Sequence, residues 1–262
     1  MFNIPNKKIL CVDIGGSFVK AILLKPNGTP ASAYQTIATP VPPSPQKIVA
    51  TVQQLADQLE DFALMSVGFP GYVRNGTILT APNLGTECWA GVNFQRILAD
   101  HFSKPVRVVN DADLQGLGIA SGKGLELVAT LGTGFGTALL LEGKLLPHFE
   151  IAHHPVHGKL DYDQYVGEAA LESLGVAAWN DRISCLIDIL HRVFNYDRLY
   201  LSGGNARLVD ILLPGNVRLS NNETGIRGGA RLWNRREQPA PRPAPTPARV
   251  DCRRMMDINA MN

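Results

Sequence analysis

The sequence has few cysteines, and their spacing gives them no common role. Cys11, Cys88, Cys185 and Cys252 are isolated from one another, with no Cys-x-x-Cys pair and no histidine placed to complete a zinc cluster. A reducing compartment fits this usage best. Cys11 lies in an apolar run, so we expect it to be a small buried side chain and not a reactive thiol.

Long apolar runs and a large excess of charge are lacking as well. No run approaches the roughly 20 residues that span a bilayer, and the apolar run after Lys8 meets Asp13 too early for a signal peptide. The formal net charge of only +2 gives no sign of a nucleic-acid or membrane surface. We therefore expect a cytoplasmic protein with no membrane partner and no nucleic-acid partner.

The sequence does contain, twice, the order of apolar run, glycine turn and apolar run. The first copy covers residues 9–24 around Gly15-Gly16, and the second covers residues 125–141 around Gly132-Thr133-Gly134. Each copy predicts a strand, a tight turn and a second strand. Small residues at such a turn let backbone amides approach an anion closely, so the two turns predict two facing phosphate cradles. A plain hairpin is the alternative for each turn alone.

The remaining patterns predict a mixed α/β fold. Helical spacing of apolar residues predicts helices, and short apolar runs predict further strands, over these ranges: helices 46–59, 111–120, 181–194 and 226–233, and strands 33–37, 63–69, 106–109 and 199–201. We expect an N-terminal α/β domain over residues 1–105 and a C-terminal α/β domain over residues 106–236. Alternating prolines over residues 237–262 predict a disordered or extended tail, with a partner-binding polyproline segment as the alternative.

Two carboxylates lie next to these motifs. Asp13 ends a predicted buried strand, where its charge is costly unless it meets a metal ion, water or amide donors. Asn110-Asp111 precedes a predicted helix, which is a common helix-start signal. Asn110 can cap that helix while Asp111 projects into a cleft, where a carboxylate can take the proton of a hydroxyl that attacks a phosphoryl group.

Taken in order, these motifs resemble the ROK sugar kinases, and within them the polyphosphate/ATP-dependent glucokinase branch, over roughly residues 8–235. The segments that carry the resemblance are Asp13-Ile14-Gly15-Gly16-Ser17 with Lys20, Gly68-Phe69-Pro70-Gly71 with Asn83-Leu84 and Trp89, Asn110-Asp111-Ala112-Asp113, Leu131-Gly132-Thr133-Gly134-Phe135-Gly136, Glu150-Ile151-Ala152-His153 and Ser202-Gly203-Gly204. The resemblance implies an actin-like, ribonuclease H-like fold of two domains with a cleft between them. It also implies transfer of a phosphoryl group from ATP or polyphosphate to a hexose, glucose foremost, with Mg²⁺ on the donor, and a homodimer as the usual assembly.

The resemblance assigns roles to individual residues. Asp111 becomes the catalytic base, and Asp13 also lies near the metal ion. The residues implied to bind the donor phosphates or nucleotide are Asp13, Gly15, Gly16, Ser17, Lys20, Gly132, Thr133, Gly134, Gly203 and Gly204. The residues implied to bind the sugar are Asn83, Asn110, Asp111, Glu150, His153 and Glu168. Trp89 either forms a wall of the sugar pocket or fills the core, and Glu168 is equally a solvated residue at a helix start.

The sequence departs from the family pattern in two places. Ala152 replaces the usual glycine of the Glu-x-Gly-His segment, which would strain the loop if that glycine had a positive φ. The stretch 157–168 has no cysteine where many ROK proteins carry a zinc cluster, so we expect no structural zinc. A metal site made of His153, His154 and His157 is the competing interpretation of that region.

Two functional alternatives stay open. ROK-type domains also occur in sugar-sensing regulators, which carry a DNA-binding helix-turn-helix ahead of the sugar domain. The phosphate motif here begins at Asp13, which leaves no room for one, and Asp111 favours catalysis. The second alternative is a sugar-binding homologue whose catalysis is weakened by the loop around Ala152.

Overall fold

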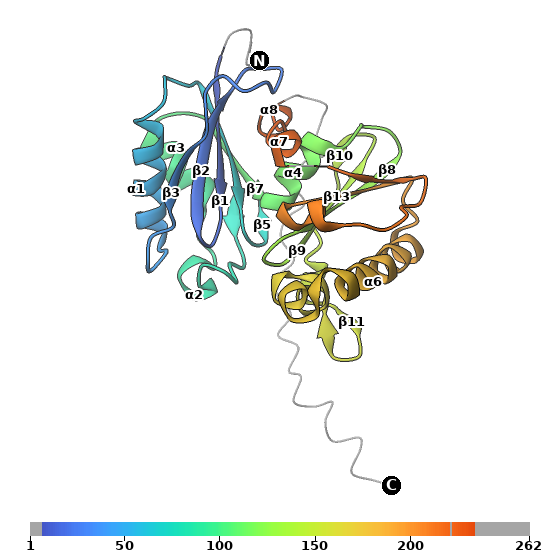
Figure 1. The fold of residues 1–262 in the computed structure, drawn as a ribbon. Coiled ribbons are helices and arrows are strands. Elements are labelled where there is room, and N and C mark those ends of the chain that lie inside the picture. The colour runs from blue at the N-terminus through green and yellow to red at the C-terminus, as the bar shows by residue number, and fades with distance from the viewer. Residues whose placement is uncertain (1–6, 221, 234–262) are drawn as a thin grey trace, which may run out of the picture.

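The structure is a computed structural model that describes residues 7–220 and 222–233. The predicted tail over residues 237–262 lies outside the described residues. The chain forms two five-stranded sheets that face each other across a layer of helices (Figure 1). Among the described residues, no helix combines the length and the apolar character needed to cross a bilayer.

The first sheet has the order β3-β2-β1-β4-β7. Its strands are β1 (Ile9–Ile14), β2 (Phe18–Leu24), β3 (Gln35–Ala38), β4 (Leu64–Phe69) and β7 (Val106–Asn110). Strands β1, β2 and β3 are antiparallel to one another, whereas β4 and β7 run parallel to β1. Because β7 pairs with β4, the change from the first sheet to the second follows Asn110, slightly beyond the boundary expected near residue 105.

Helices α1 (Pro45–Ala56) and α3 (Phe94–Phe102) cover the outer face of this sheet (Figure 1). Ser44 caps α1 by accepting from the amide of Lys47, and Pro45 begins the helix, where its missing N–H costs no hydrogen bond. The side chains of Ile48, Val52 and other residues on the inner face of α1 pack on the sheet. Two short strands, β5 (Val73–Arg74) and β6 (Thr77–Ile78), and the short helix α2 (Thr86–Trp89) connect β4 with α3.

The second sheet has the order β10-β9-β8-β13-β14 and repeats the plan of the first. Its strands are β8 (Leu125–Leu131), β9 (Phe135–Leu141), β10 (Lys144–Leu145), β13 (Arg198–Ser202) and β14 (Val217–Leu219). Helices α5 (Tyr162–Val166) and α6 (Glu168–Phe194) pack on it around the buried Trp179. The hairpin of β11 (Pro155–His157) and β12 (Leu160–Asp161) and two 3₁₀ turns, Ile151–His153 and Gly204–Leu208, complete this half.

Three helices fill the layer between the sheets: α4 (Asp111–Ile119), α7 (Asn222–Gly225) and α8 (Gly228–Arg231). Their close approach depends on glycine, because a Cβ on Gly118 would collide with the carbonyl of Gly225. The segment with α8 returns to the first sheet, where Ser66 Oγ donates to the Gly229 carbonyl at 2.6 Å and accepts from Trp233 Nε1 at 2.8 Å. Cys11 is fully buried at this contact, as expected, and burial raises the pKa of its thiol.

Candidate active site

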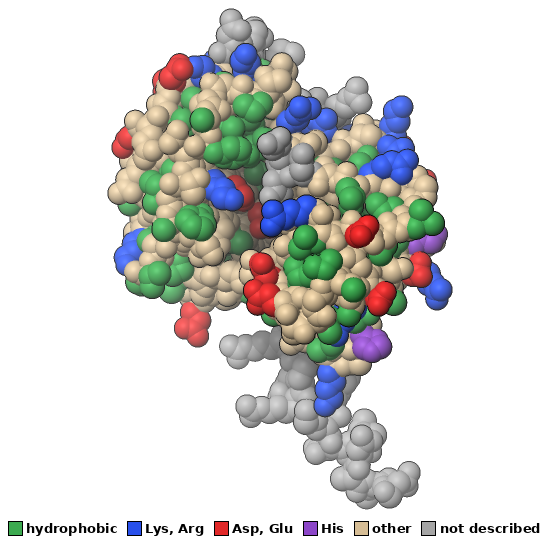
Figure 2. Space-filling view, viewed as in Figure 1, with side chains coloured by type: hydrophobic (Ala, Val, Ile, Leu, Met, Phe, Trp, Pro, Cys, Tyr) green, Lys and Arg blue, Asp and Glu red, His purple; other side chains and the backbone are tan. Residues whose placement is uncertain are grey.

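A cavity of about 290 Å³ lies between the two halves, and residues from both sheets line it. In Figure 2 the surface is hollowed between the halves, with acidic and basic side chains beside the hollow. The residues that line the cavity and that the sequence predicted for the site are Gly15, Gly16, Asn83, Asn110, Asp111, Gly132, Thr133, Gly134, Glu150, His153, Gly203 and Gly204. Asp111 and Gln115 also line a second cavity, of about 330 Å³, together with Asp13 and Lys20.

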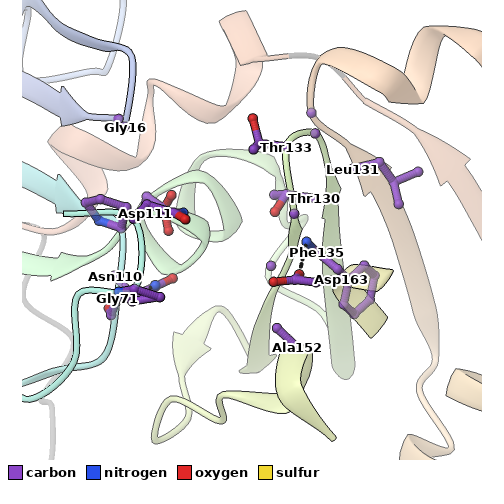
Figure 3. A pocket seen from close by; sticks show the side chains of 18 of the residues that line it. Gly16, Gly71, Asn110, Asp111, Thr130, Leu131, Thr133, Phe135, Ala152 and Asp163 are labelled. Atoms are coloured by element: carbon purple, nitrogen blue, oxygen red, sulfur yellow. Dashed lines mark hydrogen bonds between the residues drawn. The ribbon is translucent and has the colours of Figure 1, made fainter. Parts of the chain in front are cut away.

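Asp111 is the first residue of α4 and follows directly from the buried strand β7. Asn110 caps the helix as predicted, with Oδ1 accepting from the amides of Ala112 at 2.8 Å and Asp113 at 3.2 Å. Asp111 Oδ1 also accepts from the Ala112 amide at 2.8 Å. Figure 3 shows Asn110 and Asp111 on one side of the cavity and Thr133, Phe135 and Asp163 on the other. The cap therefore fixes the direction in which Asp111 enters the space between the two halves.

The surroundings of Asp111 disfavour its charge. Burial raises the pKa of its carboxyl to about 7, and the negative charges of Asp13, Glu150 and Asp113 act in the same direction, against the hydrogen bond from Ala112. A carboxyl with a pKa near 7 is only partly ionised at neutral pH. It can both accept a proton and release it under those conditions, as a general base must.

Asp13 lies opposite Lys20 in the antiparallel pairing of β1 with β2. Burial raises the pKa of Asp13, and the charge of Lys20 opposes that shift. Both side chains face the second cavity. Asp13 and Asp111 therefore both bring a carboxyl group to the second cavity, next to Lys20, and Asp111 also lines the first cavity.

The first glycine turn is held by hydrogen bonds within its own half. The Gly15 amide donates to the Phe18 carbonyl at 2.9 Å, and Thr39 Oγ1 donates to the Gly15 carbonyl at 2.7 Å. Gly15 and Gly16 line the cavity, whereas Ser17 is exposed and is not among the lining residues. The turn thus presents backbone rather than the Ser17 hydroxyl to the cavity.

The second glycine turn lies against a residue that the sequence analysis did not single out. Asp163, from α5, accepts a 2.6 Å hydrogen bond from the Phe135 amide through Oδ1 and lines the cavity (Figure 3). Next to it, Gly203 has a φ of 92°, and a Cβ there would collide with the backbone of Leu131. Gly203 is therefore required for β13 and β8 to end side by side at the cavity.

The sugar-side residues of the expected site are only partly brought together. Glu150 and His153 line the cavity, and His153 Nδ1 lies 3.9 Å from Asp161 Oδ2. Ala152 is buried in a 3₁₀ turn and is not among the described residues with a positive φ, so the strain considered for it does not arise. Glu168 begins α6 and is exposed, outside the residues that line the cavity.

Trp89 belongs to the core and not to the wall of the cavity. Its side chain is fully buried, and its ring packs against Phe69 and Phe94 at centroid distances of 4.8 and 5.0 Å. Its Nε1 donates to the Pro43 carbonyl at 2.9 Å. Trp89 therefore joins the core of the first half to the segment that precedes α1.

His148 is a second residue that the sequence analysis missed. Its side chain is only 4% exposed, and its two ring nitrogens face Asp113 and Glu150. The sequence does not predict this position of His148, because an isolated histidine ahead of the Glu150 segment matches no motif. Over residues 7–220 and 222–233, no three His, Cys, Asp or Glu side chains are placed to hold a metal ion by themselves.

Comparison with known proteins shows to which family this chain is similar. The model of the ROK family matches residues 9–164. A polyphosphate glucokinase from Mycobacterium leprae (strain TN) is 29% identical over 213 residues, which cover 78% of this chain and 65% of that protein. The chain thus spans just under two thirds of the length of this relative.

Two solved structures extend the comparison. The crystal structure of an inorganic polyphosphate/ATP-glucomannokinase from Arthrobacter sp. strain KM matches with a TM-score of 0.78 and 26% identity, over 86% of this chain and 97% of that one. A ROK family transcriptional regulator, a homologue of the E. coli MLC protein, shares the fold with a TM-score of 0.63 at 15% identity, over 88% of this chain and 78% of that one.

Two α/β halves that each bring a glycine turn to a shared cleft define the actin-like ATPase fold, as expected. Within that class the chain belongs to the ROK family, whose model matches more than half of its residues.

Proposed function

We propose that this chain is a kinase that transfers the terminal phosphoryl group of ATP or polyphosphate to a hexose, with glucose as the foremost acceptor and glucose 6-phosphate as its product. The observation that carries the proposal is the position of Asp111, which enters the cavity between a glycine turn from each half and the sugar-side residue Glu150. In-line phosphoryl transfer needs a positioned acceptor, an anion cradle and a base, and little else from the protein. The names of the relatives support the donor and the acceptor.

In the proposed step, Asp111 accepts the proton of the hexose hydroxyl while that oxygen bonds to the terminal phosphorus. The bond from phosphorus to the bridging oxygen breaks, and ADP or a shortened polyphosphate leaves with the electron pair. A carboxyl whose pKa is about 7 is suited to take this proton near neutral pH. The backbone amides of the two glycine turns would bind the phosphoryl oxygens.

Sugar recognition would come from amide and carboxylate side chains at the other end of the cavity. Asn83 and Asn110 can each donate and accept, whereas Glu150 accepts, which suits hydroxyl groups of both characters. Asn110 is already engaged with α4 and with the Gly71 carbonyl, so its share in sugar binding is the smaller one. We do not include Glu168 among the sugar ligands, because it lies outside the lining of the cavity.

Mg²⁺ is part of the proposal, and Asp13 would lie beside it. The buried carboxyls of Asp13 and Asp111 line the same cavity as Lys20. A divalent cation on the donor would offset the negative charge of these carboxyls. Since the described part of the chain has no complete ligand set, donor phosphates and water would provide the other ligands. When bound, the ion neutralises charge on the donor phosphates.

A sugar-binding regulator is the second candidate function. The likeness to a ROK family regulator supports it, although at 15% identity that likeness concerns the fold alone. A regulator needs hexose binding but no base, so a carboxyl with a pKa near 7 in the cavity favours the kinase. A cytoplasmic location and a homodimer belong to the same proposal, and the homodimer derives from the family resemblance. The division into two domains is proposed to follow β7 instead of lying near residue 105, because β7 pairs with β4.

The test uses the purified full chain with Mg²⁺, glucose or mannose, and either ATP or polyphosphate, with direct detection of the sugar phosphate. We expect phosphorylation of at least one hexose, and a loss of about a hundredfold or more in kcat for Asp111→Asn. No turnover with any pair, together with hexose binding measured by calorimetry, would favour the regulator. Full activity of Asp111→Asn would remove only the assignment of the base.

A further inference from the structure

His148 lies in the loop between β10 and the Glu150 segment, and its ring is enclosed by three other residues. Nδ1 lies 3.1 Å from Asp113 Oδ2, and Nε2 lies 3.7 Å from Glu150 Oε2. The ring also stacks on Tyr72, with centroids 5.7 Å apart and planes inclined by 29°. These contacts come from α4, from the sugar-side loop and from the loop after β4, so one side chain joins three parts of the cavity wall.

The two carboxyls beside His148 favour its imidazolium form. The Asp113 side chain is only 9% exposed, and a carboxylate buried to that extent is costly without a partner. Burial works against a charge on the ring, but the contacts with Asp113 and Glu150 outweigh burial and raise the pKa of His148 to about 10. This raised pKa favours the protonated ring, which faces a carboxyl on each side.

We propose that His148 is a positioning residue for hexose binding, which holds the Glu150 carboxylate in place relative to the catalytic Asp111. The inference rests on the proposed function. Asp113 and Asp111 share the first turn of α4, so a contact that fixes Asp113 also fixes the position of Asp111, the proposed base. Through His148, Glu150 is tied to that turn, although Glu150 itself is 31% exposed and belongs to a loop.

His148 acts through Glu150 in this arrangement and not by direct contact with the reacting atoms. His148 lines the cavity with little of its surface, since its side chain is only 4% exposed, and its ring nitrogens lie 3.1 and 3.7 Å from carboxylate oxygens. Without the ring, the Glu150 side chain would be free to rotate, and hexose binding would have to order it. The stacking on Tyr72 also joins His148 to the first half of the chain.

Two substitutions separate the two contacts. In His148→Asn the amide nitrogen takes roughly the place of Nδ1 and keeps the contact to Asp113, whereas in His148→Gln it takes roughly the place of Nε2 and reaches Glu150. We expect His148→Asn to weaken hexose binding about tenfold, measured by calorimetry without donor, and to raise the KM for hexose equally. His148→Gln should weaken it by about threefold or less, and the KM for the donor should change by less than about twofold in both.

Combination with Glu150→Gln tests whether the effect passes through Glu150. In that background, His148→Asn should weaken hexose binding by less than about twofold, because the carboxylate that His148 holds is gone. Independent effects that multiply in the double variant would overturn the inference, and so would equal losses in hexose and donor KM. A loss of the near-ultraviolet circular dichroism signal in His148→Asn would mean that this variant does not fold, and His148→Gln then provides the test. Hexose binding by His148→Gln that is as weak as that of Glu150→Gln would overturn the inference.

The outcome also separates this inference from the function on which it rests. Wild-type protein that binds and phosphorylates a hexose, with His148→Asn binding it equally well, would overturn the role of His148 alone. Wild-type protein that binds no hexose would overturn both.

Discussion

The side-chain amide of Asn110 donates a 3.1 Å hydrogen bond to the carbonyl of Gly71, while the carbonyl oxygen of the same side chain caps α4. Gly71 follows β4 and lines the cavity. One buried residue therefore fixes the start of the helix that carries Asp111 and joins it to the neighbouring loop. Both contacts need the amide, because Asp at this position could cap the helix but could not donate to Gly71.

Substitutions of Asn110 should separate these two contacts. Asn110→Ala removes both and should lower the free energy of unfolding by about 2–3 kcal/mol, from a lost cap and a buried carbonyl without its donor. Asn110→Asp keeps an acceptor for the helix amides and should be less destabilising, but it adds a negative charge beside Asp111. Urea denaturation of the three proteins measures this, and equal stability of wild type and Asn110→Ala would contradict the structure.

The pH dependence of the reaction should follow the carboxyl of Asp111. A base must be unprotonated to accept a proton, and burial raises the pKa of Asp111 to about 7. Activity should therefore decrease as the pH falls below about 7, well above the range of an exposed aspartate. A profile of kcat/KM between pH 5 and 9 measures it. A flat profile down to pH 5 would show that no group with a raised pKa limits the reaction.

The same raised pKa predicts a change in stability with pH. Between about pH 4 and 7 the folded protein binds more protons at Asp111 than the unfolded chain does, so the stability contribution of this residue decreases as the pH rises. Asp111→Asn cannot ionise, so its free energy of unfolding does not decrease in this way as the pH rises. The variant should be more stable than wild type at pH 8, by at most roughly 4 kcal/mol, and the difference should shrink toward pH 4. Thermal unfolding at both values checks the sign.

Sequence patterns predicted the fold where the periodicity was strong. The strands around both glycine turns lie where the apolar runs place them, because most residues of each run are buried, and nearly all of them in β1 and β8. The helix predicted over residues 181–194 covers only the second part of α6, since Gly175 with a φ of 74° interrupts the helical spacing before it. The packing of α8 against Ser66 joins residues far apart in the sequence, and no local pattern announces such a contact.

The candidate site could be predicted only where a motif lies in one continuous segment. Asn110 and Asp111 form a helix-start signal, and the glycines form turns, so these residues were recognisable without the fold. His148 and Asp163 become part of the cavity only because β9, β10 and α5 bring them there. Glu168 lies close to the second glycine turn through its backbone, with its amide donating to the Thr133 carbonyl at 3.3 Å, but its side chain is exposed. Proximity in sequence to a motif was not enough to place that side chain in the cavity.

Glu126 should contribute to stability and not to catalysis. This fully buried residue of β8 accepts hydrogen bonds from the amides of Ser121, Gly122 and Lys123, at 2.8, 2.7 and 3.2 Å, and from the Tyr200 hydroxyl at 3.0 Å. Burial alone would raise the pKa of Glu126, but these hydrogen bonds outweigh it and lower the pKa. Its contribution is therefore present at neutral pH and is lost in acid, below the ordinary range of a glutamate.

Replacement of Glu126 by Gln keeps the size of the side chain but turns one acceptor into a donor toward amides that also donate. We expect the free energy of unfolding at pH 7 to decrease by about 1–3 kcal/mol, with kcat and KM unchanged. Tyr200→Phe, which removes one of the hydrogen bonds, should cost about 1 kcal/mol and serves as the milder control. A change in kcat without a change in stability would contradict this assignment.

Gly203 and Gly204 form a matched pair, because they are adjacent in the cavity wall but differ in backbone conformation. Gly203 has a φ of 92°, and a Cβ there would collide with the Leu131 backbone, whereas no atom lies within 4 Å of a Cβ placed on Gly204. Gly203→Ala should therefore force β8 and β13 apart where they end and lower the free energy of unfolding by about 2 kcal/mol or more. Gly204→Ala should cost less than about 1 kcal/mol.

Since Leu131 leads directly into the second glycine turn, Gly203→Ala should also raise the KM for the phosphoryl donor more than the KM for hexose. Equal stability of the two variants would show that the strand ends can separate without cost, and the turn would then owe its shape to Asp163 and not to Gly203.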